Sequence, residues 1–243
     1  MNVVVLARES SSRYPKKHLH LINGKPLLAH IFSNIKNAGG RPILCTGAHD
    51  ENPAYVALAM ASETDFYCEE DAPTWDVVRR HVNMCDSMGI EYWIEYSGDC
   101  PFIDLTLFPM IWGRLIQGDV EQVVMPSPHS TAIPERAASG MTAKVWRRLN
   151  EYYDIDDHSR EAAFYGLPLD WYKKATLGGS RPQEKTPIKT SIDWPLEGAL
   201  VDLIVRYLGY WPKTDDDIER AYTEITKLEP VVDGSEITAK ERI

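Results

Sequence analysis

The first hundred residues alternate between short apolar runs and longer amphipathic stretches, and this alternation constrains the fold more than any other feature. Apolar runs bounded by turn residues are typical of buried strands, whereas apolar residues spaced three or four apart are typical of helices. Strands that alternate with helices favour a mainly parallel sheet with helices on both faces. We therefore expect an α/β protein with a Rossmann-like three-layer architecture and a mostly parallel central sheet.

The pattern places the expected elements along the chain. In the first half it predicts strands at 3–7, 42–46, 65–67 and 92–96, and helices at 26–35, 54–62 and 75–88. From residue 122 the pattern is less regular. There it predicts strands at 122–125 and 188–192, a loop at 126–134, and helices at 143–153, 159–165, 195–208 and 215–227. No internal repeat or low-complexity linker interrupts the sequence, so we expect a single domain over residues 1–243.

Composition and charge exclude several classes of protein. The formal net charge of −10 argues against a general nucleic-acid binder, which needs a broad surplus of Lys and Arg. No apolar stretch approaches the roughly 18 residues of a membrane span, and the N-terminus resembles a first strand rather than a secretory signal. The four cysteines, Cys45, Cys68, Cys85 and Cys100, are spaced singly, which favours neither a zinc site nor a disulfide framework. Reduced thiols are typical of the cytoplasm, so we expect a cytoplasmic protein.

A basic loop follows the first predicted strand. Its sequence, LARESSSRYPKK over residues 6–17, places four cations and three serine hydroxyls in one short segment. Backbone amides of small residues form an anion site, and Arg and Lys add charged contacts to phosphate oxygens. Composition alone leaves two interpretations open, a triphosphate site and a solvated charged loop. The segment is not a Walker loop, because it lacks the Gly-x-x-x-x-Gly-Lys-Ser/Thr pattern.

Four motifs, taken in order, resemble the signature of the CTP-dependent cytidylyltransferases. This family includes the 3-deoxy-manno-octulosonate, acylneuraminate and spore-coat polysaccharide biosynthesis types. The motifs are Ala7-Arg8-x-x-Ser11-x-Arg13-x-Pro15-x-Lys17 with Gly24-Lys25-Pro26-Leu27, then Glu69-Glu70-Asp71 with Asp76-Val77-Val78, then Ser97-Gly98-Asp99-Cys100-Pro101-Phe102-Ile103-Asp104, and Ser191-Ile192-Asp193-Trp194-Pro195-Leu196-Glu197. The resemblance implies the nucleotide-diphospho-sugar transferase version of the α/β fold. It also implies a nucleotide-binding half at 1–125, and an acceptor-binding half at 126–243 that is a candidate surface for a homodimer.

Two of these motifs carry an aspartate suited to a metal ion. Asp99 follows the predicted strand at 92–96, and ligands of such folds bind beyond the carboxyl ends of strands. Mg²⁺ prefers one or two carboxylates together with phosphate oxygens and water, so Asp99 and Asp193 form a sufficient pair, and the resemblance implies the same pair. Two alternatives stay open, namely a turn-forming role for Asp99 and a helix N-cap role for Asp193.

The resemblance also implies the residues that contact the nucleotide. The expected catalytic residues are Arg8, Arg13, Lys17 and Asp99. The expected nucleotide-binding residues are Leu6, Ala7, Arg8, Ser11, Ser12, Arg13, Lys17, Asp71, Ser97 and Gly98. The expected reaction is an in-line attack of an acceptor oxygen on the α-phosphorus of CTP, in which the three cations offset the charge on the departing pyrophosphate.

The sequence departs from the family pattern at two points. Ser10 and Lys16 stand where relatives usually have glycine, so the loop must differ if those positions require a positive φ. The segment 157–161 only loosely matches the family's Arg-Glu-His stretch, which leaves the acceptor undefined. We take His158, Arg160 and Trp194 as candidate acceptor-binding residues. The alternative is a solvated cluster for His158 and Arg160, and a core position for Trp194. His18 and His20, on either side of Leu19, could suggest a metal site. We interpret them as structural, since no third metal ligand follows at a suitable spacing.

The sequence thus predicts a Mg²⁺-dependent cytidylyltransferase that takes CTP and a small anionic acceptor, such as a sugar acid or sugar phosphate, for surface polysaccharide biosynthesis. Two rivals stay open. A nucleotide-sugar-dependent glycosyltransferase would typically show an Asp-x-Asp motif, where this chain has Ser97-Gly98-Asp99. A non-catalytic nucleotide-binding protein would keep the loop but lack turnover.

Overall fold

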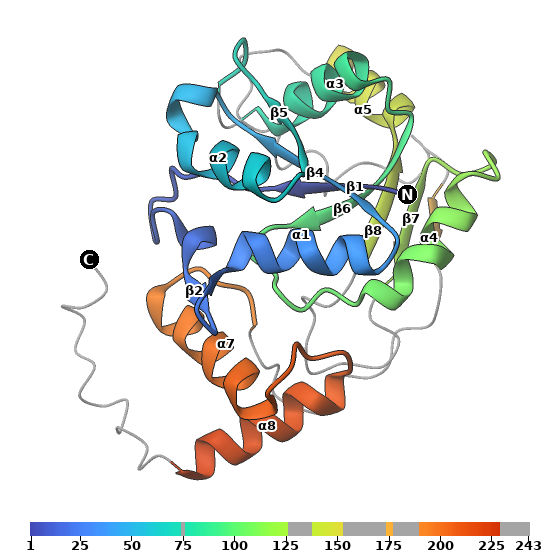
Figure 1. The fold of residues 1–243 in the computed structure, drawn as a ribbon. Helices are drawn as coiled ribbons and strands as arrows, with labels where there is room; N and C mark the ends of the chain where they lie inside the picture. The colour runs from blue at the N-terminus through green and yellow to red at the C-terminus, as the bar shows by residue number, and fades with distance from the viewer. Residues whose placement is uncertain (74–75, 126–137, 153–173, 177–189, 229–243) are drawn as a thin grey trace.

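A seven-stranded sheet forms the centre of the molecule (Figure 1). The computed structural model describes residues 1–73, 76–125, 138–152, 174–176 and 190–228. The strand order is β5-β4-β1-β6-β8-β7-β9. The strands are β1 (Asn2–Leu6), β4 (Arg41–Thr46), β5 (Asp65–Cys68), β6 (Tyr92–Ser97), β7 (Gln122–Met125), β8 (Ala138–Thr142) and β9 (Lys174–Thr176).

Parallel pairing brings the ends of the central strands to one edge. β1 lies between β4 and β6 and is parallel to both, with Leu6 opposite Cys45 on one side and Ser97 on the other. β5 continues the parallel part, whereas β8 is antiparallel to both β6 and β7. The predicted mostly parallel α/β sheet is confirmed. The loops after β1 and β6 therefore leave the sheet side by side, where ligands bind in such folds.

Helices cover both faces of the sheet, as the strand sequences require. Val3 and Val5 point into one core, whereas Val4 points into the other, because successive side chains of a strand alternate. The first core lies under α1 (Leu27–Asn37), α2 (Pro53–Ala61) and α4 (Phe108–Leu115), and the second under α3 (Val77–Met88) and α5 (Ala143–Tyr152). None of the described helices is long and apolar enough to cross a membrane.

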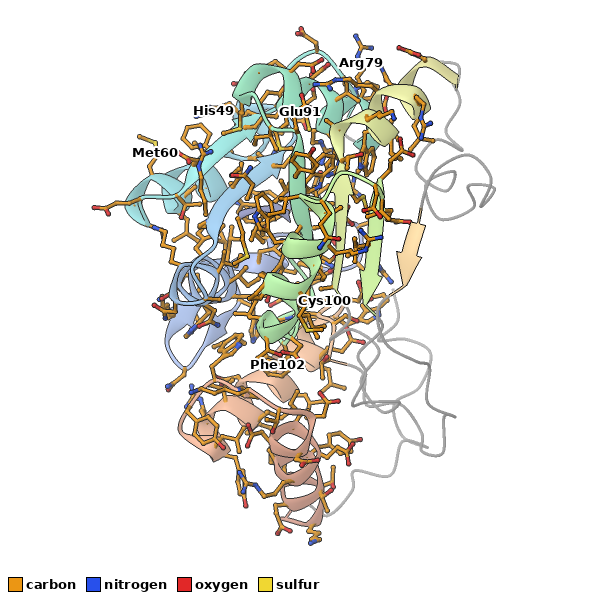
Figure 2. The ribbon with its side chains drawn as sticks, turned by 90° about the vertical axis from the view of Figure 1, so that its right-hand side faces the viewer. His49, Met60, Arg79, Glu91, Cys100 and Phe102 are labelled. Carbon is orange, nitrogen blue, oxygen red and sulfur yellow. The ribbon has the colours of Figure 1, made fainter. Side chains whose placement is uncertain are left out.

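Two C-terminal helices, α7 (Pro195–Leu208) and α8 (Asp215–Leu228), pack against each other below the sheet (Figure 1). Phe102, in the loop after β6, lies where these two helices meet the rest of the molecule (Figure 2). Its ring contacts the indole of Trp211 edge-on at 5.3 Å, and His30 of α1 stacks on the same indole at 4.8 Å. The loop after β6 is therefore held between the sheet and the C-terminal helices.

The observed elements differ from the sequence predictions in several places. Residues 190–192 form no strand, and the remainder of the strand predicted at 188–192 lies outside the described residues. The predicted loop 126–134 and helix 159–165 also lie outside them. The sequence reasoning missed β8, β9, helix α4, and the small hairpin of β2 (Leu21–Ile22) and β3 (Lys25–Pro26). β8 was missed because ASGMT is short and lacks the alternation of a half-buried strand.

Candidate functional site

The basic loop after β1 is anchored by a buried carboxylate. Glu9 is 6% exposed, and its Oε1 accepts hydrogen bonds from the N–H groups of Ala54, at 2.7 Å, and Tyr55, at 3.2 Å. Both donors lie in the first turn of α2, whose free N–H groups favour an anion. The Glu9 N–H donates to Oδ1 of Asn52 at 2.9 Å. A carboxylate in the middle of the basic loop thus fixes the loop to the neighbouring helix.

The loop turns at Lys16, which has a left-handed backbone with φ 57°. The Lys16 N–H donates to the carbonyl oxygen of Glu9 at 3.0 Å, and its Nζ lies 3.3 Å from Oε2 of the same residue. Ser10 has no positive φ. Of the two positions where relatives usually have glycine, only Lys16 needs the conformation that glycine adopts easily. Lys16 therefore adopts the left-handed turn without being glycine.

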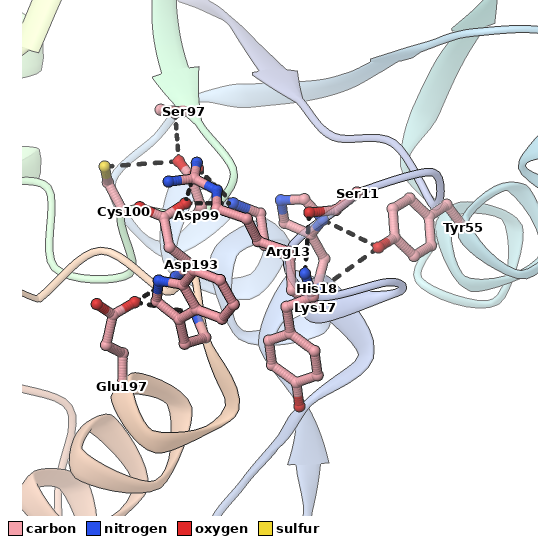
Figure 3. Close-up of polar contacts among 12 residues, drawn as sticks. Ser11, Arg13, Lys17, His18, Tyr55, Ser97, Asp99, Cys100, Asp193 and Glu197 are labelled. Carbon is pink, nitrogen blue, oxygen red and sulfur yellow. Dashed lines mark hydrogen bonds and ion pairs between the residues drawn. The ribbon is translucent and has the colours of Figure 1, made fainter. Parts of the chain in front are cut away.

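Lys17 connects the loop to both predicted metal ligands (Figure 3). Its Nζ lies 2.6 Å from Oδ2 of Asp99 and 3.3 Å from Oδ1 of Asp193. Nη2 of Arg13 lies 2.8 Å from the same oxygen of Asp193. Lys17 is 7% exposed, so its ion pairs are shielded from solvent more than a surface pair would be. Two cations and two carboxylates from three distant segments therefore meet at one point.

Asp99 is held by the turn that ends β6. The Gly98 N–H donates to the carbonyl oxygen of Leu6 at 2.9 Å, which ties this turn to the end of β1. Oδ1 of Asp99 accepts a hydrogen bond of 2.5 Å from the Ser97 hydroxyl. Burial raises the pKa of Asp99, but the Lys17 ammonium and the hydrogen bonds from Lys17 and Ser97 outweigh it and hold the pKa below its usual value. Asp99 is thus kept ionised.

Asp193 reaches the same point through a backbone bond. The Ile192 N–H donates to the carbonyl oxygen of Asp99 at 2.8 Å. On the other side, Oε2 of Glu197 accepts hydrogen bonds from the N–H groups of Asp193, at 2.6 Å, and Trp194, at 3.0 Å. Trp194, not Asp193, is the N-cap residue of α7. The side chain of Asp193 is therefore available to Lys17 and Arg13 rather than used as a helix cap.

The two carboxylates fit a magnesium ion. A single cation, the Lys17 ammonium, already lies between Asp99 and Asp193, so both can contact one positive centre. Within the part of the chain that the structure describes, no group of three His, Cys, Asp or Glu side chains could hold a metal ion. Zinc sites use three or four such ligands, whereas Mg²⁺ is often held by one or two carboxylates plus phosphate oxygens. The donor set suits a metal that arrives with a nucleotide.

A pocket of about 330 Å³ opens beside these residues. Nine of the predicted residues line it, namely Leu6, Ala7, Arg8, Ser11, Ser12, Arg13, Lys17, Ser97 and Asp99. Gly98, Asp71, Asp193 and Trp194 are not among its lining residues, and His158 and Arg160 lie outside the described part of the chain. The sequence reasoning missed six lining residues, which are His18, Val77, Val78, Arg80, Glu95 and Trp146.

His18 supports the pocket from within. It is 3% exposed, and burial lowers its pKa to about 3, so the imidazole is neutral. Its backbone N–H donates to the Tyr55 hydroxyl at 3.3 Å, and its Nδ1 lies 3.0 Å from that oxygen. Because the hydroxyl already accepts the backbone N–H, its own hydrogen is best placed on Nδ1. This bond also joins the loop to α2, in agreement with the structural role expected from the sequence.

Comparison with known proteins places this arrangement in context. A family model described as cytidylyltransferase matches residues 2–124, half of the chain. The 3-deoxy-manno-octulosonate cytidylyltransferase of Pasteurella multocida (strain Pm70) is 24% identical over 188 residues, which are 76% of this chain. The match spans 66% of that relative's own length. The matched family region contains β1, its basic loop and Asp99, whereas Asp193 lies beyond it.

Solved structures share the fold. A cytidylyltransferase from Leptospira borgpetersenii serovar Hardjo-bovis (strain JB197) superposes with a TM-score of 0.75 at 13% identity, covering 93% of this chain and 94% of that one. A CMP:2-keto-3-deoxy-manno-octonic acid synthetase, solved in complex with CTP, has a TM-score of 0.61 at 14% identity, covering 84% of this chain and 98% of that one. At such low identity, these similarities establish the fold alone.

Proposed function

Because the chain belongs to the cytidylyltransferase family, we propose that it transfers CMP from CTP to a small anionic acceptor and releases pyrophosphate. The observation that carries this proposal is the meeting of Arg13 and Lys17 with Asp99 and Asp193 beside the pocket. A triphosphate needs cations for its oxygens, and a metal-assisted transfer needs carboxylates at the reacting phosphate. The two cations and the two carboxylates lie within hydrogen-bond distance of each other.

In the proposed reaction, the acceptor oxygen attacks the α-phosphorus while the bond to the bridging oxygen of the pyrophosphate breaks. Arg8, Arg13 and Lys17 would contact the phosphate oxygens and offset the charge that accumulates on the leaving group. Lys17 would then leave the carboxylates that it contacts in the free protein. Because a single displacement at phosphorus suffices, no covalent intermediate with a side chain is required.

We propose Mg²⁺ as the metal and Asp99 and Asp193 as the residues that hold it. When bound, the ion would polarise the α-phosphate and lower the pKa of the acceptor hydroxyl. The low pKa of Asp99 supports this role, because an ionised carboxylate needs no proton release before it binds a cation. The Lys17 ammonium would occupy the cation position until the nucleotide arrives, and thereby limit the repulsion between the two carboxylates.

For the acceptor we propose a sugar acid or sugar phosphate used in surface polysaccharide synthesis. The similarity to a curated enzyme named 3-deoxy-manno-octulosonate cytidylyltransferase supports this class. Trp194, 39% exposed and next to Asp193, is the described candidate for an acceptor contact. A cytoplasmic location, where CTP is available, and a homodimer complete the proposal.

Isothermal titration with CTP, ATP and a set of nucleotide sugars, each with and without Mg²⁺, tests the proposed function. A cytidylyltransferase binds CTP most tightly, and Mg²⁺ strengthens that binding. Tight binding of a nucleotide sugar while CTP is ignored would instead indicate a glycosyltransferase. CTP binding without acceptor-dependent pyrophosphate release from any tested acceptor would favour a non-catalytic nucleotide-binding protein.

A further inference from the structure

One end of the pocket is not used by the proposed phosphate chemistry. The apolar residues that line it are Val77 and Val78, at the start of α3, and the buried Trp146 of α5. Two charged residues, Arg80 and Glu95, line the pocket with them. The phosphate-binding cations come instead from the loop after β1. The pocket therefore combines a strongly cationic part with a part that has apolar walls and one charge of each sign.

Glu95 is an unusual residue for its position. It lies in the middle of β6, opposite Val4 of β1, on the sheet face that carries the core under α3 and α5. Its neighbours Ile94 and Tyr96 point into the other core. No other described residue forms a hydrogen bond or ion pair with the Glu95 carboxyl group, and burial raises its pKa to about 7. A carboxyl group in such surroundings costs stability unless a partner satisfies it.

Arg80 provides the complementary group. It is 4% exposed, lies on α3 and lines the same pocket. Burial raises the pKa of the Cys45 thiol to about 12, while Arg80 lowers it and Glu95 raises it. Both residues therefore act on the Cys45 thiol, and both belong to the lining of one pocket. Together they offer guanidinium donors and a carboxylate acceptor to a ligand in that pocket.

This combination matches one edge of cytosine. Cytosine presents its N4 amino group as a donor, next to N3 and O2 as acceptors, whereas uracil presents O4 as an acceptor next to an N3–H donor. Apolar walls suit the faces of either base, so the polar pair must supply the discrimination. The ionised carboxylate, which is the main form of Glu95 above about pH 7, would be repelled by O4 of uracil but accepts a hydrogen bond from the N4 amino group of cytosine.

We propose that Glu95 and Arg80 select the base of the nucleotide, with Glu95 accepting a hydrogen bond from N4 of cytosine and Arg80 donating to N3 or O2. This inference rests on the proposed function, since it takes the pocket as the CTP site. It adds a specificity determinant that lies outside the four sequence motifs: a pair that reads the base, distinct from the residues that bind phosphate and metal.

The test is calorimetric binding of CTP and UTP at pH 8, where the Glu95 carboxyl group is mainly ionised, both with Mg²⁺, to the wild-type protein and to Glu95→Gln. Glutamine has nearly the same shape, but its amide can also donate to O4 of uracil. We expect the ratio of the CTP to the UTP affinity to fall at least about 10-fold, the size of a single hydrogen-bond mismatch. Glu63→Gln, at an exposed position after α2, is the matched control and should keep the wild-type ratio.

The outcomes separate the two proposals. An unchanged ratio in Glu95→Gln, together with a clear CTP preference of the wild type, would overturn the base-selection proposal and leave the cytidylyltransferase proposal standing. A wild type that does not bind CTP would contradict the proposed function itself. Thermal melting checks that the variant folds. If it does not, Arg80→Lys provides the second test, because it keeps the charge but loses the planar donor pair, and the same fall in the ratio is expected.

Discussion

The carbonyl oxygen of Asp99 accepts a hydrogen bond of 2.8 Å from the backbone N–H of Ile192. This bond joins the turn after β6 to the segment before α7, and so places the next residue, Asp193, within reach of Lys17. The two proposed metal ligands are thus connected through the backbone, and the Lys17 ammonium contacts both of their side chains. The backbone bond and the Lys17 ammonium together hold the two carboxylates at one point.

Substitution of Asp193 by asparagine tests the second metal ligand. The amide keeps the shape but loses the charge that faces Arg13 and Lys17, so we expect acceptor-dependent pyrophosphate release to fall about 100-fold or more. The matched control is Asp216→Asn, an exposed carboxylate in the first turn of α8, which should keep wild-type activity. Equal turnover by wild type and Asp193→Asn at limiting Mg²⁺ would exclude Asp193 as a ligand.

Gly98 is required by the close approach of the strands at the site. A Cβ atom there would lie 2.6 Å from the carbonyl oxygen of Leu6 and 3.0 Å from the ring of His18. Because a backbone atom cannot move aside easily, Gly98→Ala should lower the free energy of unfolding by about 1–3 kcal/mol in urea titrations. Gly113→Ala is the control, since a Cβ in that helix meets nothing within 4 Å, and it should stabilise by about 0.5–1 kcal/mol.

The two positions where relatives usually have glycine should respond with opposite sign. Lys16 has φ 57°, so Lys16→Gly relieves a backbone strain of roughly 1–2 kcal/mol and should raise the free energy of unfolding. The Lys16 side chain is 60% exposed, and Glu9 is also satisfied by the N–H groups of α2, so the loss of their ion pair costs less than this relief. Ser10 has no positive φ, so Ser10→Gly only adds freedom to the unfolded chain and should lower stability slightly. Two changes of the same sign in urea titrations would refute this explanation.

His81 should make the protein sensitive to mild acid. Its ring stacks on those of Trp93 and Trp146, which also contact each other, and burial lowers its pKa from 6.5 to about 4. Between pH 6.5 and pH 4 the imidazole is protonated in the unfolded chain but not in the folded protein. The free energy of unfolding therefore falls as the pH drops through 6.5, and it levels off below about pH 4. From pH 7 to pH 5 the loss for this residue is roughly 2 kcal/mol.

The measurement for His81 compares urea unfolding of wild type and His81→Phe at pH 7 and pH 5. His18 acts in the same direction and Glu95 in the opposite one, but both are common to the two proteins. The difference between the proteins therefore isolates His81. The variant should lose less stability than wild type over this range, and parallel losses would show that His81 is not the source.

The sequence predicted the parallel half of the fold and the first part of the site because both are local. Apolar runs mark β1, β4 and β6, and the basic loop must follow β1 wherever the rest of the chain goes. β8 was not predictable in this way. Its Gly140 lies so close to Ile111 and Leu115 of α4 that a Cβ would meet their side chains at 2.4 Å and 2.6 Å, a requirement that appears only in three dimensions.

The other missed features depend on packing between distant segments. Resemblance could pair Asp99 with Asp193, but the Ile192 bond that joins them appears only in the structure. Glu95 did leave a signal in the sequence, because a charged residue interrupts the apolar run Trp93-Ile94-Glu95-Tyr96. That Glu95 lines the pocket, however, could be seen only in the structure.

The central claim is that this site transfers CMP from CTP, and pyrophosphate release tests it most directly. Wild-type protein is incubated with CTP and Mg²⁺ and a panel of sugar acids and sugar phosphates, alongside Asp99→Asn and a wild-type sample treated with a chelator. We expect pyrophosphate to appear with at least one acceptor and a fall of about 100-fold or more in the variant and the chelated sample. Release that is equally fast in Asp99→Asn, or in the presence of the chelator, would contradict the account.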